Sequence, residues 1–351
     1  MRKIINMSKE DKRFIFDTAS LKMKIHPAII EKDFWVCYIL DYLFYTSKYK
    51  DYFTFKGGTS LSKAYNVISR MSEDIDLILD WQLLGAKIYE PLEDRSKRQQ
   101  EIYNEKLNNL AKNFIANELY EDLLNGFKDI PEFKIEVVKE EQLVNIYYPK
   151  TYDTDNIGIL PCVRLEIGPL AAWTPASIME INPYICGVIP NFVVSGTKVR
   201  TVAIERTFWE KITILHREAN RPESKKMPKR YARHYYDVYQ IFKSKYFNKI
   251  LTSKQILEKV TKFKIKFYND NWAKYDDVLN GNIKILPPNF RLEELIEDYN
   301  SMKEMINGEA PNFNNIIISL KELEKILKNE IKESTDKKRI KKFVKKNFVE
   351  A

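Results

Sequence analysis

The stretch from Phe55 to Leu79 reads FKGGTSLSKAYNVISRMSEDIDLIL, and it decides the fold. It begins as the end of an apolar, aromatic run and turns at Gly57-Gly58. Apolar residues at 61, 64, 65 and 68 then keep the spacing of one helix face. Asp74-Ile75-Asp76 opens a second apolar run, which predicts a buried strand. The predicted order is strand, glycine turn, helix, turn and strand.

The glycine turn has the chemistry of a phosphate-binding element. Glycine lets the backbone approach a ligand closely, and the start of a helix offers unpaired N–H groups and a positive dipole end. Either Thr59 or Ser60 could cap the helix that follows or donate a hydroxyl to phosphate. A Gly-Gly pair alone is a weak signal, because it is also a simple way to build a turn.

Asp74 and Asp76 have the spacing of a metal-binding pair. Alternate residues of a strand point to the same face, so the two carboxylates are expected side by side. Like charges that close are costly unless a cation neutralises them, and Mg²⁺ is typically held by one or two carboxylates together with substrate phosphates. An acidic strand end without a ligand is the competing interpretation. The order of turn, helix and acidic strand favours a nucleotide–metal site.

The composition is that of a large globular chain with a surplus of basic residues. Its 351 residues are 44% hydrophobic and 30% charged, with a net charge of +9 and a pI of about 9.0. The length suits two domains, and the charge is compatible with a polyanion partner. Cys37, Cys162 and Cys186 show neither a disulfide framework nor a metal spacing. With no signal peptide or membrane-spanning run in view, we predict a cytoplasmic protein.

The first two hundred residues are predicted to form one domain of helices and strands. A helix is predicted to start at Pro27, and its charged run Glu31-Lys32-Asp33 is interpreted as a solvated face rather than a catalytic cluster. Residues 94–126 read as helix, 133–138 and 144–148 as a possible hairpin, and 169–198 as loop.

Glu166 is the third candidate acid. Residues 161–167 alternate as a half-buried strand, and Glu166 lies on the same side as Arg164. Glu166 could complete a carboxylate cluster with Asp74 and Asp76 from a neighbouring strand. It could equally pair with Arg164 or another base, since this alternation is found in any half-buried strand.

From about residue 200 the pattern changes to long helices, so we place a domain boundary there and predict domains at 1–200 and 201–351. The helices are predicted at 204–217, 231–244, 254–267, 291–306 and 314–333. The segment 199–203 before them reads as a short strand.

Two of these helices carry charged residues in unexpected places. Lys211 falls inside the apolar stripe of helix 204–217 and must snorkel, pair with an acid, or reach into a cleft where it could bind a triphosphate. Asp237 lies at the edge of the core face of helix 231–244. It could orient Lys211, accept a proton from an attacking hydroxyl, or pair with Arg233. His234 is interpreted as a surface or paired histidine rather than a metal ligand.

The segment 217–233 between these helices is strongly basic. Basic residues beside tyrosines suit contact with an RNA backbone and with stacked bases. The candidate RNA-binding residues are Arg221, Lys225, Lys226, Lys229 and Arg230. A merely solvated loop is the competing interpretation.

Four motifs together resemble one family. The motifs are Gly57-Gly-Thr-Ser-Leu-Ser-Lys-Ala64, Arg70-Met-Ser-Glu-Asp-Ile-Asp-Leu77, Glu205-Arg-Thr-Phe-Trp-Glu-Lys211 and Arg233-His-Tyr-Tyr-Asp237. They occur in the order seen in the AbiEii/AbiGii toxin family of nucleotidyltransferases, and Glu31-Lys-Asp-Phe34 is similar to the family's early signature. The resemblance covers about residues 30 to 245.

The resemblance implies an α+β fold, with a polymerase-β-like mixed sheet, flanking helices and an α-helical C-terminal domain. It implies a toxin with a cognate antitoxin, which uses an NTP and Mg²⁺ or Mn²⁺ to transfer a nucleotide to RNA. The 3′ end of tRNA is the expected acceptor, and a block of translation is the expected result.

The resemblance also assigns roles to individual residues. Asp74, Asp76, Lys211 and Asp237 would be catalytic, with Asp74 and Asp76 as metal ligands. Glu166 stays a further candidate ligand on the strength of the strand pattern. The nucleotide contacts would come from Gly57, Gly58, Thr59, Ser60, Lys63, Ser72 and Lys211. Two other functions stay open: a small-molecule nucleotidyltransferase, such as one that modifies an antibiotic, and a non-catalytic toxin that sequesters NTP or RNA.

Overall fold

The computed structural model describes residues 1–72, 74–154, 159–188, 196–268, 270–303 and 305–344. The chain divides into two compact units. The first comprises Met1–Asn66 and Met71–Ala203, and the second comprises Val67–Arg70 and Ile204–Ala351. The short segment 67–70 therefore belongs to the second unit, although both of its neighbours in the chain belong to the first.

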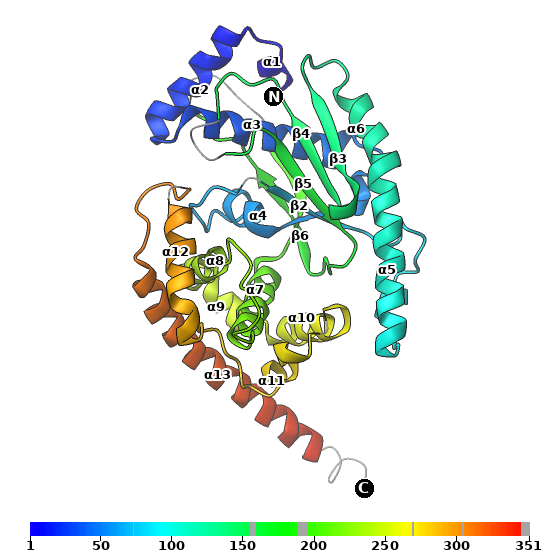
Figure 1. Ribbon diagram of the computed structural model, residues 1–351, viewed down its shortest axis with the longest axis vertical. Coiled ribbons are helices and arrows are strands. Elements are labelled where there is room, and N and C mark those ends of the chain that lie inside the picture. The colour runs from blue at the N-terminus through cyan, green and yellow to red at the C-terminus, as the bar shows by residue number, and fades with distance from the viewer. Residues whose placement is uncertain (73, 155–158, 189–195, 269, 304, 345–351) are drawn as a thin grey trace. The chain divides into compact units, whose positions relative to one another are not determined.

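The first unit is built on a seven-stranded mixed sheet (Figure 1). Its order is β3-β4-β5-β2-β1-β7-β6, with β2 parallel to β5, β1 parallel to β7, and the other pairs antiparallel. The strands are β1 (Phe53–Lys56), β2 (Asp74–Leu79), β3 (Lys134–Val138), β4 (Leu143–Tyr147), β5 (Val163–Gly168), β6 (Ala176–Ile181) and β7 (Thr197–Val202). The predicted α+β class and mixed sheet are confirmed.

Burial alternates along the two central strands. On β2, Ile75 and Leu77 are buried in the core while Asp74 and Asp76 are half-buried on the other face. On β5, Val163 and the following alternate apolar residues are buried in the same way. Hydrophobic burial thus fixes the strand register and leaves one face of the sheet to its polar residues.

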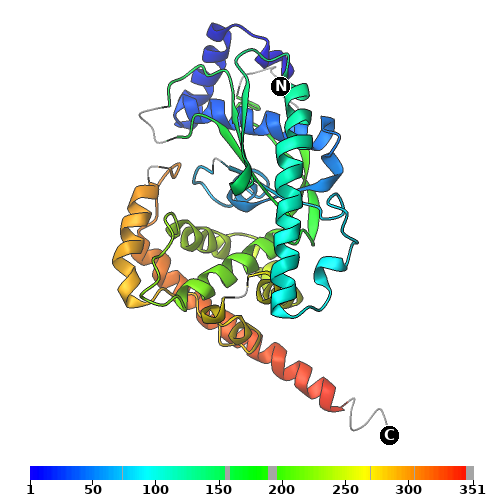
Figure 2. The ribbon, with the colours of Figure 1, turned by 45° about the vertical axis from the view of Figure 1, so that its right-hand side comes forward.

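Among the described residues, the first unit also contains six α-helices. They are α1 (Arg2–Ile5), α2 (Lys9–Met23), α3 (Pro27–Asp41), α4 (Gly57–Lys63), α5 (Lys97–Phe114) and α6 (Tyr120–Phe127). A π-helical turn over residues 115–119 joins α5 to α6, so the predicted helix 94–126 becomes one long rod, coloured cyan in Figure 2. Pro27 occupies the first turn of α3, as predicted.

The charged run of α3 is buried, so the prediction of a solvated face is wrong. Glu31 accepts the backbone N–H groups of Thr151 and Tyr152, at 2.8 and 3.3 Å from its carboxylate oxygens. The Lys32 ammonium donates to the carbonyl of residue 160, and Asp33 is paired with Lys63. Buried charges need such partners, and these partners come from chain segments that the helix pattern cannot identify.

The helix after the glycine turn also differs from its prediction. It ends at Lys63 instead of continuing to residue 68, and Lys56 is its N-cap residue without a side-chain cap. Thr59 and Ser60 therefore do not cap it. The remaining apolar positions of the predicted helix, Tyr65 and Ile68, are still buried.

One strand differs from its prediction. The sequence predicts loop over 169–198, but this segment contains β6, the edge strand that pairs with β7. Most of β6 is exposed or half-buried, so it lacks the clean alternation of a half-buried strand. Residues 189–195 of that interpretation lie outside the described chain.

The second unit is helical, as predicted (Figure 1). Its helices are α7 (Ile204–Ala219), α8 (Ala232–Lys243), α9 (Phe247–Leu251), α10 (Lys254–Phe267), α11 (Tyr275–Leu279), α12 (Leu292–Lys303) and α13 (Phe313–Val344). Helices α7 and α8 pack against each other, α7 also packs on α10, and α8 on α12 and α13.

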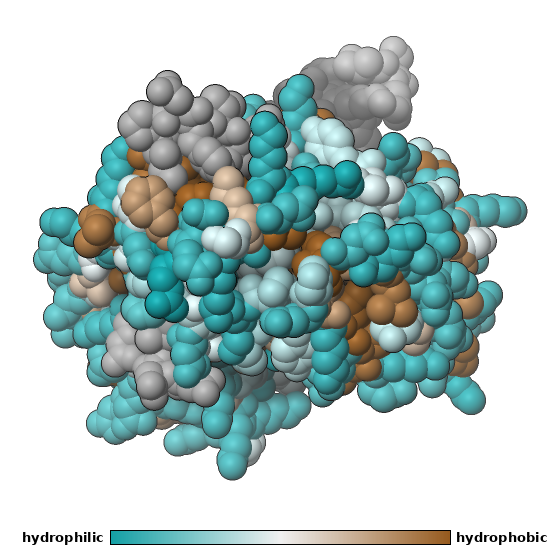
Figure 3. All heavy atoms as spheres, turned by 90° about the horizontal axis from the view of Figure 1, so that it is seen from above, coloured by the Kyte–Doolittle hydropathy of each residue, from teal (hydrophilic) through white to brown (hydrophobic). Residues whose placement is uncertain are grey.

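One face of the molecule is mainly hydrophilic. The face in Figure 3 is mostly teal, with separate brown apolar patches. Among the described residues, no helix combines the length and the apolar character needed to cross a bilayer.

Candidate active site

The sheet unit carries a polar row that crosses three strands. Asp76 on β2 is in register with Lys56 on β1 and with Glu166 on β5. Asp74 is in register with Arg164 on β5. Paired residues of neighbouring strands present their side chains on one face. The two candidate metal ligands and Glu166 therefore share the half-buried face of the sheet.

The first residue of α4, Gly57, must be a glycine. Its φ is +80°, a conformation that disfavours residues with a side chain. A Cβ atom at this position would lie 1.8 Å from Oδ2 of Asp76 and 2.4 Å from its Cγ. The Asp76 carboxylate thus occupies the space that a side chain at 57 would fill, which brings the turn and the acidic strand together.

The hydroxyl groups around this turn hold backbone carbonyls. Thr59 Oγ1 donates to the carbonyls of Ser72 and Asp74, and Ser60 Oγ donates to Gly57 at 2.9 Å. Both hydroxyls are buried. Thr59 therefore ties α4 to the start of β2, and its hydroxyl proton is already engaged. The predicted phosphate contacts of Gly58, Thr59, Ser60 and Ser72 remain predictions.

Lys63 lies in a buried ion pair. Its ammonium pairs with Asp33 of α3 and lies 4.1 Å from the ring centroid of Tyr184. Asp33 also accepts the Tyr184 backbone N–H at 2.7 Å. Burial alone would lower the pKa of Lys63, but its neighbours, chiefly Asp33, raise it instead. Lys63 is thus a charged anchor between α4 and α3, and its predicted contact with nucleotide stays a prediction.

The carboxylates suit a hard cation that also binds substrate. Among the described residues, no three His, Cys, Asp or Glu side chains gather as a group that could hold a metal ion. Asp74 and Asp76 on one face still provide the one or two carboxylates that Mg²⁺ typically takes from a protein when phosphates complete its shell. The donor set therefore fits, and Glu166 as a third ligand stays a prediction.

The helical unit contains a buried ion cluster centred on Asp237. The Asp237 carboxylate accepts two bonds from Arg70, at 2.7 and 2.8 Å, and lies 2.8 Å from the Lys211 ammonium. All three side chains are buried. Burial alone would raise the pKa of Asp237, but Arg70 and Lys211 outweigh it and hold the pKa well below its usual range. Of the three predicted roles of Asp237, the structure shows the orientation of Lys211.

His234 is the second partner of Lys211. Its Nδ1 lies 3.4 Å from the Lys211 ammonium, and burial, with Lys211 and Arg233 nearby, holds the pKa of His234 well below its usual range. An ammonium can only donate, so a neutral His234 accepts at Nδ1. Lys211 has three N–H donors, and in the described chain two have acceptors, namely Asp237 and His234. Among the described residues, no further acceptor faces the third donor.

The segment 67–70 is fixed within the helical unit by backbone bonds as well. The carbonyl of Ser69 accepts the N–H of Asn307 at 2.9 Å, and Arg70 forms a β-bridge with Ile306. Arg70 is thus held by its backbone and by its guanidinium. It precedes Asp74 by four residues in the chain.

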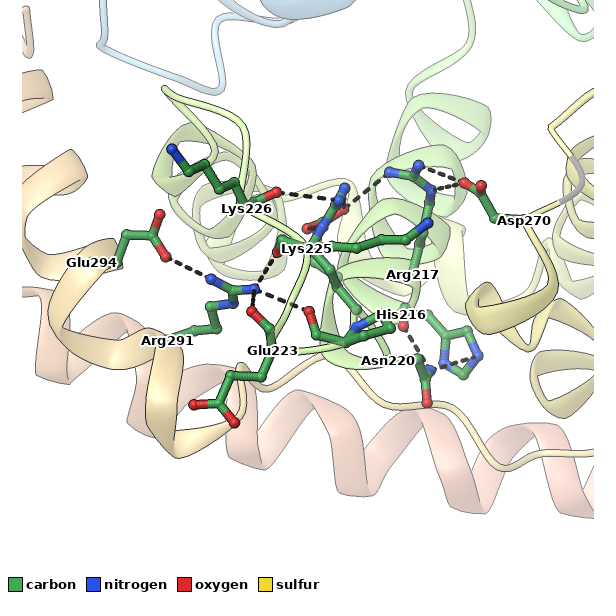
Figure 4. A network of polar contacts seen from close by, with 12 residues as sticks. His216, Arg217, Asn220, Glu223, Lys225, Lys226, Asp270, Arg291 and Glu294 are labelled. Atoms are coloured by element: carbon green, nitrogen blue, oxygen red, sulfur yellow. Dashed lines mark hydrogen bonds and ion pairs between the residues drawn. The ribbon is translucent and has the colours of Figure 1, made fainter.

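The basic segment divides into paired and exposed cations (Figure 4). Arg217 is paired with Asp270 at 2.9 Å, and Arg221 with Glu218 at 2.6 Å. Both guanidinium groups also lie over the ring of Trp272. The four remaining candidates, Lys225, Lys226, Lys229 and Arg230, are exposed. Arg221 is therefore committed to the fold. Lys225 is exposed, but its ammonium lies 5.4 Å from the ring centroid of Trp272, whereas Lys226, Lys229 and Arg230 face solvent.

Comparison with known proteins places this chain in a class. A family model described as "Nucleotidyl transferase AbiEii toxin, Type IV TA system" matches residues 38–329. The chain is therefore a nucleotidyltransferase of the kind found as the toxin in toxin–antitoxin systems. It belongs to the AbiEii family, so the resemblance read from its motifs is confirmed, and an antitoxin partner is implied.

Solved structures and curated proteins provide two further comparisons. The chain is similar to MenT4, the nucleotidyltransferase toxin Rv2826c from Mycobacterium tuberculosis H37Rv, with 13% identity and a TM-score of 0.44. The match covers 93% of this chain and 88% of that chain. No curated protein matches the sequence.

Sequence reasoning missed two residues of these sites. Arg70 stands inside a quoted motif, but its partner Asp237 is 167 residues away. Lys56 precedes the glycine pair, and only the register of β1 with β2 places it beside Asp76. A buried aspartate facing one lysine could have suggested a second cation, because isolated buried charges are costly.

Proposed function

We propose that this protein transfers a nucleoside monophosphate from an NTP to an RNA hydroxyl, with the 3′ end of tRNA as the acceptor, and thereby blocks translation. A new bond forms between the hydroxyl oxygen and the α-phosphorus. The bond from the α-phosphorus to pyrophosphate breaks, and the hydroxyl proton passes to water. Family membership supports nucleotidyl transfer, and the exposed cations of residues 225–230 support RNA as the acceptor.

The observation that carries the proposal is the contact of Gly57 with Asp76. A turn that keeps its backbone against a carboxylate, with a second carboxylate on the same strand face, suits a triphosphate and its cation. Mg²⁺ held by Asp74 and Asp76 would supply charge neutralisation at the phosphates. Gly57 keeps the turn close, and Thr59 fixes the start of β2.

Lys211 is the proposed cation for phosphate charge in the helical unit. Asp237 keeps Lys211 in place while Arg70 shares the carboxylate. Asp237 is a poor proton acceptor, because two cations hold its pKa low. The catalytic roles of Lys211 and Asp237 are part of the proposal.

The test is transfer of label from each α-labelled NTP to total RNA with Mg²⁺. Asp74→Ala and Asp76→Ala are expected to lower transfer by about 10³-fold. Asp80→Asn, a substitution just after the other end of the same strand, is the matched control and should transfer like the wild type. Transfer by either alanine variant at the wild-type rate would overturn the proposal.

The alternatives give different products. A small-molecule transferase would label a low-mass compound and leave RNA unlabelled, and a sequestering toxin would bind RNA or NTP without labelling either. Mass analysis of the target therefore separates the three functions. The exposed cations favour RNA over a small substrate.

A further inference from the structure

The segment that carries the exposed cations, residues 221–230, is anchored along its length, and we call it the basic loop. Arg291, directly before α12, donates through one guanidinium nitrogen to the carbonyls of Pro222 and Glu223, both at 3.2 Å, and of Lys225 (Figure 4). Its other terminal nitrogen pairs with Glu294 at 3.0 Å. One half-buried arginine therefore gathers three carbonyls of the loop.

A second anchor holds the far end of the loop. The Asp298 carboxylate of α12 accepts the backbone N–H of Arg230 at 2.6 Å and of Ala232 at 2.7 Å. Ala232 begins α8, the helix that carries His234 and Asp237. The loop thus leads directly into the helix that positions Lys211.

The charges on this anchored backbone are not compensated. Within the described chain, the side chains of Lys226, Lys229 and Arg230 have no acidic partner, although Glu223 is an exposed acid in the same loop. The ion pairs of this region go instead to Arg217, Arg221 and Arg291. Uncompensated cations in so short a segment repel one another, so a fixed backbone that keeps them together favours a polyanion partner.

The chemistry of the surface favours RNA over an acidic protein. Protein interfaces are centred on buried apolar and aromatic side chains. The large apolar side chains exposed in the described chain all lie outside the basic loop. RNA backbone, by contrast, is bound by cations without an apolar centre.

We propose that Arg291 and Asp298 pre-organise the basic loop as a binding surface for the RNA backbone, with Lys226, Lys229 and Arg230 as the phosphate contacts. Holding a loop in its bound form lowers the entropy lost on binding. Arg291 and Asp298 are therefore positioning residues that touch no RNA. This inference rests on RNA being the substrate class in the proposed function.

The experiment is a salt titration of the binding of labelled deacylated tRNA to the full chain, without NTP or Mg²⁺. Replacing Lys226 and Lys229 together by glutamine removes two contacts, so the slope of log K against log salt should fall by roughly 1.4 to 1.8. Arg291→Lys keeps the charge but cannot gather three carbonyls. It should weaken binding by about threefold to tenfold with an unchanged slope.

A pair of substitutions on α12 separates anchoring from charge. Asp298→Asn and Glu293→Gln each remove one negative charge, but only Asp298 holds the loop backbone, and Glu293 is exposed on the same helix. Charge alone predicts tighter binding for both variants. Pre-organisation predicts weaker binding for Asp298→Asn and no weakening for Glu293→Gln.

Three results would overturn the inference: an unchanged slope for the double glutamine variant, a reduced slope for Arg291→Lys, or equal binding by the two α12 variants. Poly-glutamate that binds as tightly as tRNA and responds to the same variants would assign the surface to an acidic protein instead. Label transfer is measured in parallel. If the wild-type chain binds RNA as expected but transfers no label, the proposed function alone is overturned.

Discussion

Two regions bring charges together in different ways: the acidic row of the sheet, which is Asp74, Asp76 and Glu166, and the Asp237 cluster of the helical unit. On the sheet, Asp74 and Asp76 are half-buried and share a face, with a glycine turn against Asp76. In the helical unit, Asp237 is fully buried between two cations at hydrogen-bond distance. The first arrangement gathers carboxylates on one face, with Lys56 and Arg164 in register beside them, and the second places one carboxylate between two cations.

This difference separates a ligand-receiving site from a positioning site. Neighbouring carboxylates repel one another, so the sheet site is expected to gain stability from a bound cation. The charge of Asp237 is already compensated by Arg70 and Lys211. Among the described residues, one N–H donor of Lys211 has no acceptor. Substitutions on the sheet should therefore affect activity more than stability, and substitutions at Asp237 should affect both.

Among the substitutions that compare the two sites, a methyl group at Gly57 should have the largest effect on activity. Gly57→Ala places a Cβ atom on the Asp76 carboxylate and should lower nucleotidyl transfer by roughly 10²-fold or more, since the carboxylate must move. Gly85→Ala is a matched control, because its φ is +82° but the space around it is open. Both variants should lose about 1–2 kcal/mol of stability from backbone strain. Equal transfer rates for the two would show that Asp76 does not need its place beside the turn.

Asp237→Ala should have the largest effect on stability. It leaves Arg70 and Lys211 buried without their shared anion, so the free energy of unfolding should fall by about 3–5 kcal/mol in urea titrations. Lys211→Met should cost less, because Asp237 keeps both bonds to Arg70. Glu210→Gln breaks a partly exposed pair with Arg206 and should cost at most about 1 kcal/mol. A similar loss of unfolding free energy in all three variants would show that the Asp237 cluster contributes no more to stability than a partly exposed ion pair.

The two sites also differ in how far the sequence could predict them. The acidic row follows from a period of two along β2, a local pattern that needs no partner. The Asp237 cluster depends on Arg70, which is 167 residues away in the chain. Arg70 belongs to the short segment 67–70, which lies in the helical unit although its neighbours in the chain lie in the sheet unit. For the same reason Glu31 looked solvated: its partners are two backbone N–H groups in a distant loop. Apolar periodicity predicts helices and strands well, but partners of buried polar groups are fixed only by tertiary structure.

Acid should weaken the helical unit before it affects the carboxylates. His216 accepts the Lys284 N–H and bonds to the Lys274 carbonyl, both at 3.0 Å, and burial lowers its pKa, as it does for His234. Above pH 6.5 these histidines are neutral in both folded and unfolded chains, so their stabilisation is complete. Below pH 6.5 these histidines are protonated more readily in the unfolded chain than in the folded chain. The free energy of unfolding therefore falls by up to about 1.4 kcal/mol per pH unit for each histidine.

The measurement is a urea titration at pH 7.5, 6.5 and 5.5. His234→Asn should remove one histidine's share of the pH dependence while retaining the rest. The stabilisation linked to the lowered pKa of Asp237 lies in a separate window, since it is lost only as the pH falls below about 4. Stability that does not change between pH 7.5 and 5.5 would mean that both histidines can be protonated in the folded chain.

The smallest expected effect tests how Lys211 is aimed. The oxygen of asparagine is bonded to Cγ, as Nδ1 of histidine is, whereas the oxygen of glutamine lies one bond further out. His234→Asn should therefore keep an acceptor for Lys211, and His234→Gln should misplace it. We expect kcat to fall by about tenfold in the glutamine variant and to change little in the asparagine variant, at similar KM and similar Tm. Because both variants lose the same ring, packing alone predicts equal kcat values, and that outcome would show that His234 only fills space beside Lys211.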